Sequence, residues 1–233
     1  MCNIIISLVL YNNDSNELND LILSINNLSK EIEKGDGKLI FYIYDNSPID
    51  TLKDYLYNNI KKEIETKYYH DKRNKGFGYG HNRNLLDFKN NENDIYIVIN
   101  PDISFESKSL LRLIKSFQRK KNLSCVAPLI KNTKGSIQYS AKNNPTISSL
   151  ALGRLGTFNI GFLEKYIEKN QNKKYDYEKD IINCCYLSGC FLIIKAQAYT
   201  KINGFCEKYF LHMEDADIVR RLSYIGETIH NPK

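Results

Sequence analysis

Three acidic residues stand close together late in the chain, Glu214, Asp215 and Asp217. The apolar residues that follow repeat with the period of a helix and form one stripe, made of Ile218, Val219, Leu222 and Ile225. Asp215 falls on this stripe, where a carboxylate costs free energy unless it has hydrogen-bond donors or faces a cavity. Partial desolvation there raises its proton affinity, which suits a general base at the floor of a cleft. The sequence therefore predicts that Asp215 accepts a proton in a reaction.

The two acidic neighbours of Asp215 have other interpretations. Asp217 and Arg221 have the i,i+4 spacing of an exposed ion pair on a helix, which stabilises the helix by about 0.3 kcal/mol. Glu214 is either a first-turn acid that interacts with the helix dipole or a group that hydrogen-bonds a substrate hydroxyl.

A second carboxylate follows a strongly apolar run, in the sequence Asn100-Pro101-Asp102. If the run is a buried strand, Asp102 lies at the rim of a sheet, where oxygen ligands could hold a divalent cation that bridges the protein to a diphosphate. The alternative is a plain turn, since Asn-Pro pairs commonly begin one.

The stretch from Asn74 to Asn82 is rich in glycine, with Gly76, Gly78 and Gly80 at alternate positions. It lacks the third glycine of a dinucleotide-binding fingerprint and follows the third strand of the pattern instead of the first, and no P-loop sequence occurs. We interpret it as a loop whose backbone can approach a ligand closely, with Asn74, Lys75, His81 and Asn82 as polar neighbours. The alternative is a tight connection without a binding role.

The elements that must position these residues alternate between strand and helix in the first half. Apolar runs predict strands at residues 4–10, 39–44, 65–69 and 95–99, and amphipathic segments predict helices around 18–28, 52–60 and 82–88. This order predicts an α/β fold with a parallel sheet and right-handed crossovers. Ligands of such sheets bind beyond the carboxyl ends of the strands, which here are Tyr11-Asn12, Asp45-Asn46, 73–82 and 100–102.

The second half is less regular. We predict a helix near 110–117, a strand near 124–128, a possible hairpin through 132–135, a return of regular structure at 186–195, a helix at about 214–225 and a strand near 228–231. Residues from about 143 to 180 show weak periodicity, which indicates an insertion or a lid. No repeat or flexible linker divides the chain, so we expect one domain with two functional halves.

Composition limits the class of protein. The 233 residues are 42% hydrophobic and 26% charged, which excludes a disordered tail, and no apolar run approaches the roughly 20 residues of a membrane span. The first residues carry no signal-peptide pattern, so we expect a cytoplasmic protein. The six cysteines form no CxxC pair, and reduced thiols are favoured over a metal cluster of Cys184, Cys185 and Cys190.

The formal net charge of +6 is spread over short basic clusters, which indicates a solvated face or attraction to phosphates of a nucleotide or an anionic lipid surface. Nucleic acid is not expected as a partner, because zinc-finger spacings, aromatic RNA-binding motifs and long basic helices are all missing from the sequence.

Three pieces of the chain together resemble one family. They are the stretch from Asn74 to Asn82, the strand end Asn100-Pro101-Asp102, and the segment from Ser188-Gly189-Cys190-Phe191 through Asn203-Gly204-Phe205 to Glu214-Asp215-Ala216-Asp217. In this order they resemble GT-A glycosyltransferases of the rhamnosyltransferase-like, inverting type. The resemblance implies a GT-A, Rossmann-like, mostly parallel sheet flanked by helices, in a single domain over 1–233, with a nucleotide-sugar donor half at 1–102 and an acceptor half at 103–233.

The resemblance also implies roles for individual residues. Tyr11 and Asn12 would lie against the nucleoside, Asp45 would accept a hydrogen bond from a pyrimidine base, and Asn74, Lys75, Gly76, Asn82 and Asn100 would line the donor site. Asn100-Pro101-Asp102 takes the place of the family's DxD motif, so Asp102 alone would offer a carboxylate to Mn²⁺ or Mg²⁺. Asp215 matches the catalytic base, with Glu214 beside it.

The implied reaction transfers a sugar such as rhamnose from a dTDP or UDP donor to a polysaccharide or lipid-linked acceptor, with inversion and with peripheral membrane contact. Relatives continue beyond the strand near 228–231 into a segment whose histidine completes the metal site, whereas this chain ends at Lys233 and His230 takes a strand position. Two alternatives stay open. One is a sugar-phosphate nucleotidyltransferase, although the first strand is followed by Tyr11-Asn12-Asn13-Asp14 and not by a loop rich in glycine and arginine. The other is a nucleotide-sugar-binding module with weak or no transfer.

Overall fold

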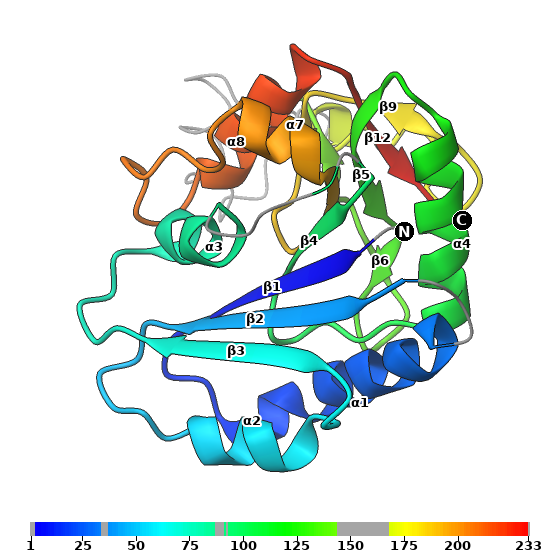
Figure 1. Ribbon diagram of the computed structural model, residues 1–233. Helices are drawn as coiled ribbons and strands as arrows, with labels where there is room; N and C mark the ends of the chain where they lie inside the picture. Colours follow the sequence, from blue (N-terminus) through cyan, green and yellow to red (C-terminus); the bar gives the residue numbers. More distant parts are fainter. Residues whose placement is uncertain (1–2, 34–36, 87–90, 92, 144–167, 233) are drawn as a thin grey trace.

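An eight-stranded sheet runs through the part of the chain that the structure describes. The computed structural model describes residues 3–33, 37–86, 91, 93–143 and 168–232. The four strands of the first half are β1 (Ile4–Leu10), β2 (Leu39–Asp45), β3 (Glu65–His70) and β4 (Ile95–Ile99). They pair in parallel in the order β3-β2-β1-β4, as predicted (Figure 1). Their carboxyl ends therefore meet at one edge of the sheet.

The strands of the second half extend the same sheet. They are β5 (Leu123–Pro128), β9 (Ile182–Asn183), β11 (Phe191–Lys195) and β12 (Glu227–Asn231), in the order β4-β11-β5-β12-β9. β11 is antiparallel to both β4 and β5, so its first residue enters the sheet at the edge where β4 and β5 end. The predicted fold class, a mostly parallel sheet flanked by helices, is confirmed.

Short strands lie beside the main sheet. β6 (Ile130–Lys131) pairs with β7 (Ile137–Gln138), which confirms the hairpin predicted through residues 132–135. β8 (Ala141–Lys142) pairs with β10 (Tyr186–Leu187). The predicted insertion or lid at about 143–180 falls largely on residues 144–167, outside the described residues.

Helices cover both faces of the sheet and make three layers (Figure 1). One face carries α1 (Ser15–Ile32), α2 (Lys53–Asn59) and α4 (Ser107–Arg119). The other face carries α3 (Phe77–Leu85), α7 (Ala196–Lys201) and α8 (Glu214–Ser223). No helix in the described ranges combines the length and apolar character that a membrane span requires.

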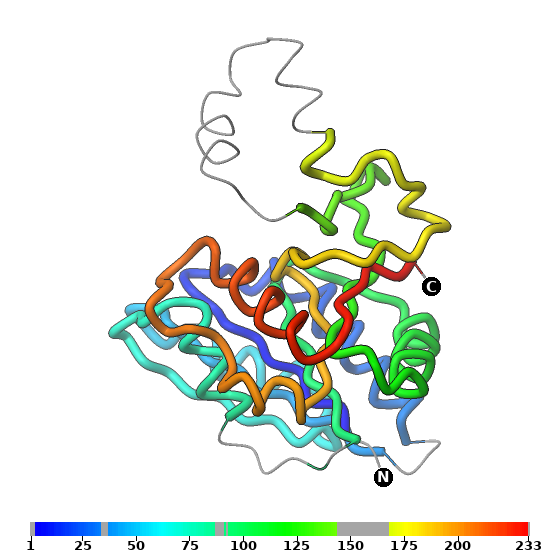
Figure 2. Tube along the Cα trace, turned by 90° about the horizontal axis from the view of Figure 1, so that it is seen from above, coloured from blue at the N-terminus to red at the C-terminus, as the bar shows by residue number. Residues whose placement is uncertain are grey.

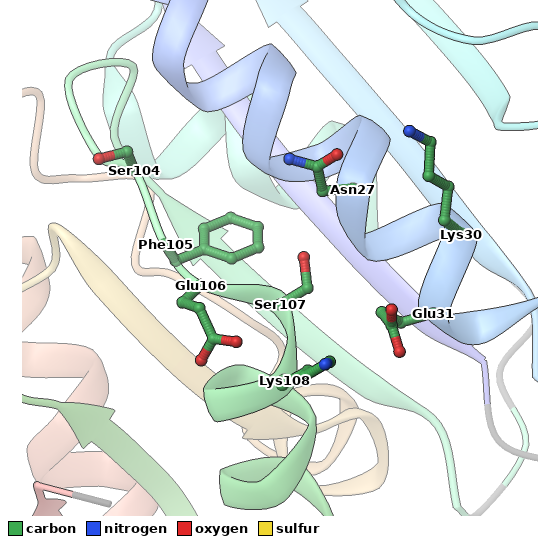
Figure 3. Close-up of a pocket in the computed structure, with 8 residues that line it drawn as sticks. All are labelled: Asn27, Lys30, Glu31, Ser104, Phe105, Glu106, Ser107 and Lys108. Atoms are coloured by element: carbon green, nitrogen blue, oxygen red, sulfur yellow. The ribbon is translucent and has the colours of Figure 1, made fainter.

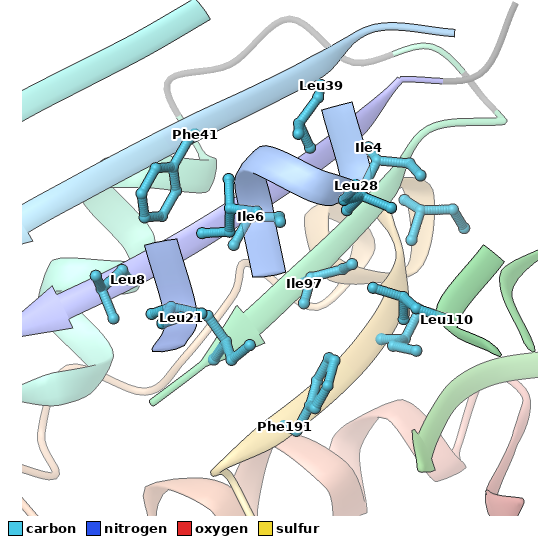
Figure 4. Close-up of a cluster of buried hydrophobic side chains, with 14 of the residues drawn as sticks. Ile4, Ile6, Leu8, Leu21, Leu28, Leu39, Phe41, Ile97, Leu110 and Phe191 are labelled. Atoms are coloured by element: carbon cyan, nitrogen blue, oxygen red, sulfur yellow. The ribbon is translucent and has the colours of Figure 1, made fainter. Parts of the chain in front are cut away.

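Side chains of β1 alternate between the two cores. Ile4, Ile6 and Leu8 pack toward α1 with Leu21 and Leu28, as Figure 4 shows. Ser7 points to the opposite face and is fully buried. Its hydroxyl lies 2.7 Å from Nδ1 of His81 and accepts a hydrogen bond of 3.0 Å from the side-chain amide of Asn84, so α3 is attached to the middle of β1 by polar groups.

The glycine-rich stretch is helical over most of its length, and the prediction that the helix begins near Asn82 is wrong. α3 begins at Phe77, directly after Gly76, whose φ of +96° favours glycine. A Cβ on Gly78 would lie 2.8 Å from Cβ of Phe205, and one on Gly80 would lie 2.7 Å from a methyl group of Val9. The glycines therefore allow close packing within the protein, which overrides their low helix propensity.

The regular structure predicted at 186–195 consists of two strands. β10 ends at Leu187, β11 begins at Phe191, and Ser188-Gly189-Cys190 forms a turn between them. The short helix α7, which follows β11 directly, is not predicted from the sequence pattern.

Gly204 packs where a side chain does not fit, and we expect Gly204→Ala to lower the free energy of unfolding. Its φ is +63°, and a Cβ would overlap the Asn82 side-chain oxygen and lie 2.8 Å from the Tyr199 ring. The expected loss is about 2 to 4 kcal/mol by urea denaturation. Gly135→Ala is the matched control, because Gly135 has φ +81° and has no atom within 4 Å of that position, so it should lose only about 1 kcal/mol. Equal losses in the two variants would show that close packing at Gly204 is unimportant.

Candidate active site

The loop after β1 presents an aromatic ring at the carboxyl edge of the sheet. Tyr11 is 51% exposed, and Asn12 follows it in the left-handed region with φ +54°, a conformation that asparagine tolerates. The backbone N–H of Asn12 donates to the Ser47 hydroxyl at 2.9 Å, which joins this loop to the loop after β2. The ring of Tyr11 is therefore accessible on a supported backbone.

Asp45 lies at the end of β2 and is completely buried. One carboxylate oxygen accepts from the Ser47 backbone N–H at 2.8 Å, and the other accepts from the Tyr68 hydroxyl at 2.6 Å. Burial and the hydrogen bonds to Asp45 and Asp50 raise the pKa of Tyr68 far above its usual range. The position predicted to meet a pyrimidine base is thus occupied by the protein's own donors, and Asp45 fixes the loop after β2.

The turn before α3 is held from two sides. Asn46 donates to the Gly76 carbonyl at 3.3 Å, and the Asn74 side chain accepts from the Gly76 N–H at 3.3 Å. A Cβ on Gly76 would overlap the Phe210 carbonyl, and the Phe77 N–H donates to that same carbonyl at 3.2 Å. The predicted close approach is therefore to Phe210 of this chain, while Asn74 is half-buried and Lys75 is exposed.

Asn82, which was expected to line the donor site, is buried and uses all of its hydrogen-bonding capacity within the protein. Its amide nitrogen donates to the Phe205 carbonyl at 2.9 Å and to Glu207 at 3.0 Å. Its oxygen accepts from the Tyr199 hydroxyl at 2.8 Å and from the Phe205 N–H at 2.8 Å. The expectation for Asn82 is corrected: this side chain attaches α3 to the segment that leads to α8.

Asn100 and Asp102 follow β4 and line a cleft of about 720 Å³. The Asn100 N–H donates to the Cys190 carbonyl at 2.9 Å, and Asp102 is exposed. Burial is the largest cause that raises the pKa of the Cys190 thiol, and the negative charge of Asp102 contributes in the same direction. Asp102 therefore lies close to the turn formed by Ser188-Gly189-Cys190.

A complete metal centre of protein ligands is not formed by these residues. Among the residues that the structure describes, no group of three or more His, Cys, Asp or Glu side chains could hold a metal ion. Asp102 offers one carboxylate and Asn100 one amide oxygen. Mg²⁺ and similar hard cations are commonly held by one or two carboxylates together with substrate phosphates and water, so the pair fits a cation that arrives with a diphosphate.

The start of α8 reverses the expected environments of two neighbouring carboxylates. Glu214 is only 7% exposed, and its Oε2 is buried without a hydrogen-bond partner in the described structure. Burial, together with the nearby charge of Asp215, raises the pKa of Glu214 above its usual value. Asp215, predicted on the apolar side of the helix, is instead half-buried. The desolvated carboxyl group is thus Glu214.

Asp215 is held by donors from the adjacent turn and helix. One carboxylate oxygen accepts from the Gly189 N–H at 3.2 Å, and the other accepts from the Ala216 N–H at 2.8 Å. The charge of Asp215 and a hydrogen bond to it add to burial in raising the pKa of the Tyr186 hydroxyl. Tyr186 is a site neighbour that the sequence did not identify, whereas Gly189 belongs to the motif Ser188-Gly189-Cys190-Phe191 without a role having been predicted for it.

The backbone before α8 is unusual. His212 and Met213 have φ values of +70° and +72°, two consecutive left-handed residues that are not glycine. Such conformations cost on the order of 1 to 3 kcal/mol each and persist where the surroundings fix them. Arg221 supplies part of that support, because its guanidinium donates to Asp217 at 2.6 Å and to the carbonyls of Ile202 and Gly204.

The predicted pair Asp217–Arg221 therefore exists, but it is not an exposed surface pair. Its side chains are only about a quarter exposed, at 24% and 27%. The pair anchors α8 to the segment that follows α7.

The two predicted carboxylates both lie at one short turn, Ser188-Gly189-Cys190. Asp102 is near Cys190, Asp215 bonds to Gly189, and these two residues are adjacent in the chain. Ser188 and Cys190 also line the cleft that contains Asp102. The structure thus brings together the end of β4 and the start of α8, and the roles expected for Asp102 and Asp215 stay predictions.

A second hollow, of about 620 Å³, lies between α1 and the start of α4 (Figure 3). Lys30 and Glu31 come from α1, and Glu106 and Lys108 come from the beginning of α4. Its charges are mixed, and it contains none of the residues that the sequence analysis selected. Ser104 and Phe105 separate it from the cleft at Asp102, because both residues line both hollows.

No family model matches the chain, but several known proteins are similar to it in sequence. It is 26% identical over 161 residues to rhamnosyltransferase WbbL of Escherichia coli, covering 66% of this chain and 57% of that protein. It is 29% identical over 133 residues to N-acetylglucosaminyl-diphospho-decaprenol L-rhamnosyltransferase of Mycobacterium tuberculosis, covering 57% of this chain and 42% of that protein. The matches thus span about half the length of these curated relatives.

Solved structures share the fold over nearly the whole chain. Mannosyltransferase PcManGT from Pyrobaculum calidifontis, in complex with GDP-Man and Mn²⁺, matches 98% of this chain and 55% of its own with a TM-score of 0.63 and 11% identity. GalNAc-T7 with UDP, GalNAc and Mn²⁺ matches 99% of this chain and 42% of its own with a TM-score of 0.66 and 13% identity. The chain has the fold of GT-A glycosyltransferases and is similar in sequence to rhamnosyltransferases, so the predicted resemblance is confirmed.

Glu214 should make stability depend on pH. Because its folded-state pKa is raised, the folded protein holds this proton more tightly than the unfolded chain, and stability falls as the pH rises from about 4.5 through the folded pKa. Glu214→Gln removes this dependence. We expect the unfolding free energy of the variant, relative to wild type, to increase between pH 4.5 and pH 7.5 in urea denaturation. A difference that stays constant or decreases with pH would contradict the raised pKa.

Proposed function

We propose that this protein is an inverting glycosyltransferase that transfers a sugar, rhamnose being the first candidate, from a nucleoside-diphosphate donor to a hydroxyl group of a glycan or lipid-linked acceptor. The observation that carries the proposal is that Asp102 and Asp215 both lie at the turn Ser188-Gly189-Cys190. One carboxylate can then face a leaving diphosphate while the other faces the attacking hydroxyl. The similarity to rhamnosyltransferases supports the choice of sugar.

The donor is proposed to bind along the carboxyl ends of β1 to β4, within residues 1–102. The exposed ring of Tyr11 offers a surface on which a base can stack, and Asn12, Asn74 and Lys75 add polar groups beside it. Asp45 and Asn82 support these loops from the interior, for the reasons given above. We propose a dTDP or UDP donor; a neighbour of this fold that was solved with UDP supports a nucleoside diphosphate at this edge.

A divalent cation, Mn²⁺ or Mg²⁺, is proposed to be held by Asp102, with Asn100 as a second oxygen ligand. Two neighbours of this fold were solved with Mn²⁺. When bound, such a cation neutralises charge that develops on a leaving diphosphate. Because the protein provides few ligands, the phosphates of the donor would complete the coordination.

Asp215 is proposed as the general base. Each of its oxygens accepts one backbone N–H, at 3.2 Å and 2.8 Å, and keeps a lone pair for a further proton donor. The acceptor hydroxyl would give its proton to Asp215 as its oxygen forms a bond to the anomeric carbon, and the bond from that carbon to the diphosphate oxygen would break. Attack from the side opposite the diphosphate inverts the configuration. Glu214, whose pKa is raised by burial, is proposed to hydrogen-bond an acceptor hydroxyl beside Asp215.

Replacing the base tests this assignment. We expect Asp215→Asn to reduce sugar transfer by about 100-fold or more while donor binding is retained, because general-base catalysis contributes roughly that factor. Asp217→Asn is the matched control on the same helix, since Asp217 is paired with Arg221, and it should change transfer less than about threefold. The measurement is steady-state transfer with a dTDP-sugar or a UDP-sugar.

The outcome also separates the alternatives. If Asp215→Asn keeps turnover within about threefold of wild type, the base assignment is wrong. If the wild-type protein is stabilised by a donor but transfers nothing under any tested condition, a nucleotide-sugar-binding module is the better description. Pyrophosphate release from a nucleoside triphosphate would favour a nucleotidyltransferase.

A thermal-shift panel tests the donor and the cation together. We expect one of UDP, dTDP, GDP and CDP to raise the melting temperature selectively, and Mn²⁺ to increase that shift, because a ligand that binds the folded state stabilises it by mass action. Asp102→Ala should remove the increase caused by Mn²⁺ and leave most of the nucleotide's own effect. Glu106→Ala, which removes another exposed carboxylate of the same cleft, is the control and should keep the Mn²⁺ effect. An unchanged Mn²⁺ effect in Asp102→Ala would contradict the assignment.

A further inference from the structure

Three consecutive apolar side chains are exposed just before the helix that carries Asp215. Tyr209 is 38% exposed, and Phe210 and Leu211 are each 55% exposed. The contacts that hold this segment are made by its backbone, since the Phe210 carbonyl accepts from the Phe77 N–H. The three side chains therefore remain in solvent although the backbone that carries them is fixed.

Basic residues precede this apolar tip and occur in the loop beside it. Lys208 precedes it, and Lys72 and Arg73 come from the loop after β3, which the contact between Gly76 and Phe210 places beside it. The two loops lie next to each other in both views, at the left of Figure 1 and of Figure 2. We call these six residues the basic–apolar rim: Lys72, Arg73, Lys208, Tyr209, Phe210 and Leu211.

The charge of the rim is positive after internal pairs are considered. The nearby carboxylates are Asp71, which pairs with Arg73 at 2.6 Å, Glu207, which pairs with Arg83 at 3.4 Å, and the first two residues of α8, the buried Glu214 and Asp215, which accepts backbone N–H groups. Lys72 and Lys208 form no ion pair within the described ranges. Lys75, also exposed, adds a further positive charge to the same loop. The rim thus combines apolar side chains with uncompensated lysines.

We propose that the basic–apolar rim docks on an anionic lipid bilayer. Aromatic and aliphatic side chains insert at the boundary between headgroups and acyl chains, and neighbouring lysines are attracted to anionic headgroups. A protein partner fits less well, because three exposed apolar side chains are a small part of the roughly 800 Å² per partner that a stable interface buries.

The basic–apolar rim lies close in the chain to the proposed general base, so docking on a bilayer would affect which acceptors reach it. Leu211 is followed within four residues by Asp215, so a bilayer at the rim lies next to the proposed base. This step rests on the proposed function: a lipid-linked acceptor would present its hydroxyl to Asp215 without leaving the membrane surface. The name of the mycobacterial relative includes such an acceptor.

Vesicle sedimentation tests the docking without donor or acceptor. The full chain is mixed with vesicles of phosphatidylcholine alone or of equal parts phosphatidylcholine and phosphatidylglycerol, and the bound fraction is measured. We expect binding to the anionic vesicles only, weakened by high salt. The double variant Phe210→Ser with Leu211→Ser should lower partitioning by roughly tenfold or more. The double variant Lys72→Glu with Lys208→Glu should lower it by at least roughly fivefold for each lysine.

Matched controls alter equally exposed residues on α1 and α4. Leu23→Ser changes an apolar residue that is 59% exposed, and Lys115→Glu changes an exposed lysine, and neither should affect binding. Melting temperatures of all variants are measured in parallel, and the charge variant provides a second result if the serine variant is unstable.

Several results would overturn the proposal. They are equal binding of the wild type to both kinds of vesicle, unchanged binding by both rim variants, or a lipid-free dimer that the serine variant abolishes, which would assign the rim to a second copy. Because the assay contains no substrate, failure here leaves the test of Asp215 unaffected. If docking serves the lipid-linked acceptor, both rim variants should lose transfer to that acceptor and keep transfer to a water-soluble one.

Discussion

The arrangement of the site depends on the hydrogen bonds of the Asn82 side-chain amide. It joins α3 to Phe205, Tyr199 and Glu207, which lie more than a hundred residues later in the chain. Because all of its donors and acceptors are used within the interior, the loss of any partner would leave a buried polar group unsatisfied. The same segment continues to Phe210, whose carbonyl caps the start of α3. The proposed donor loops and the start of α8 are thereby held in one frame.

The carboxylates at the start of α8 divide into two environments. Glu214 is buried and has a raised pKa, whereas Asp215 is half-buried and accepts two backbone N–H groups. Backbone donors stabilise a carboxylate in its charged form, and burial without donors favours the neutral form. Two adjacent acids therefore have different surroundings: Asp215 accepts backbone N–H groups, and Glu214 has a buried oxygen without a hydrogen-bond partner in the described structure.

The sequence predicts the parallel half of the sheet well, because continuous aliphatic runs such as Ile95–Ile99 are typical of strands buried on both faces. It also predicts that residues near Asp102 and Asp215 meet, although through a family resemblance. Contacts between distant segments explain the errors. The helical start at Phe77 depends on Phe205 and Phe210, and the exchange of roles between Glu214 and Asp215 depends on the left-handed pair His212 and Met213. A helical wheel considers only the spacing of residues along one helix, so it includes neither the contacts with distant segments nor the left-handed backbone before α8.

The polar contact of Ser7 with His81 and Asn84 helps to determine the register of β1 in the sheet. The side chains of β1 are apolar on both faces, so sliding the strand by one or two positions would bury nearly the same hydrocarbon area. Only the native alignment brings the Ser7 hydroxyl opposite His81 and Asn84, and a shift would bury this hydroxyl away from both partners, although the Asn84 amide also donates to the carbonyls of Leu8 and Tyr42. Ser7 thus favours the native register of β1 over shifted registers of similar apolar burial. Because the loops at the sheet edge follow directly from the strands, the register of β1 also determines where these loops lie.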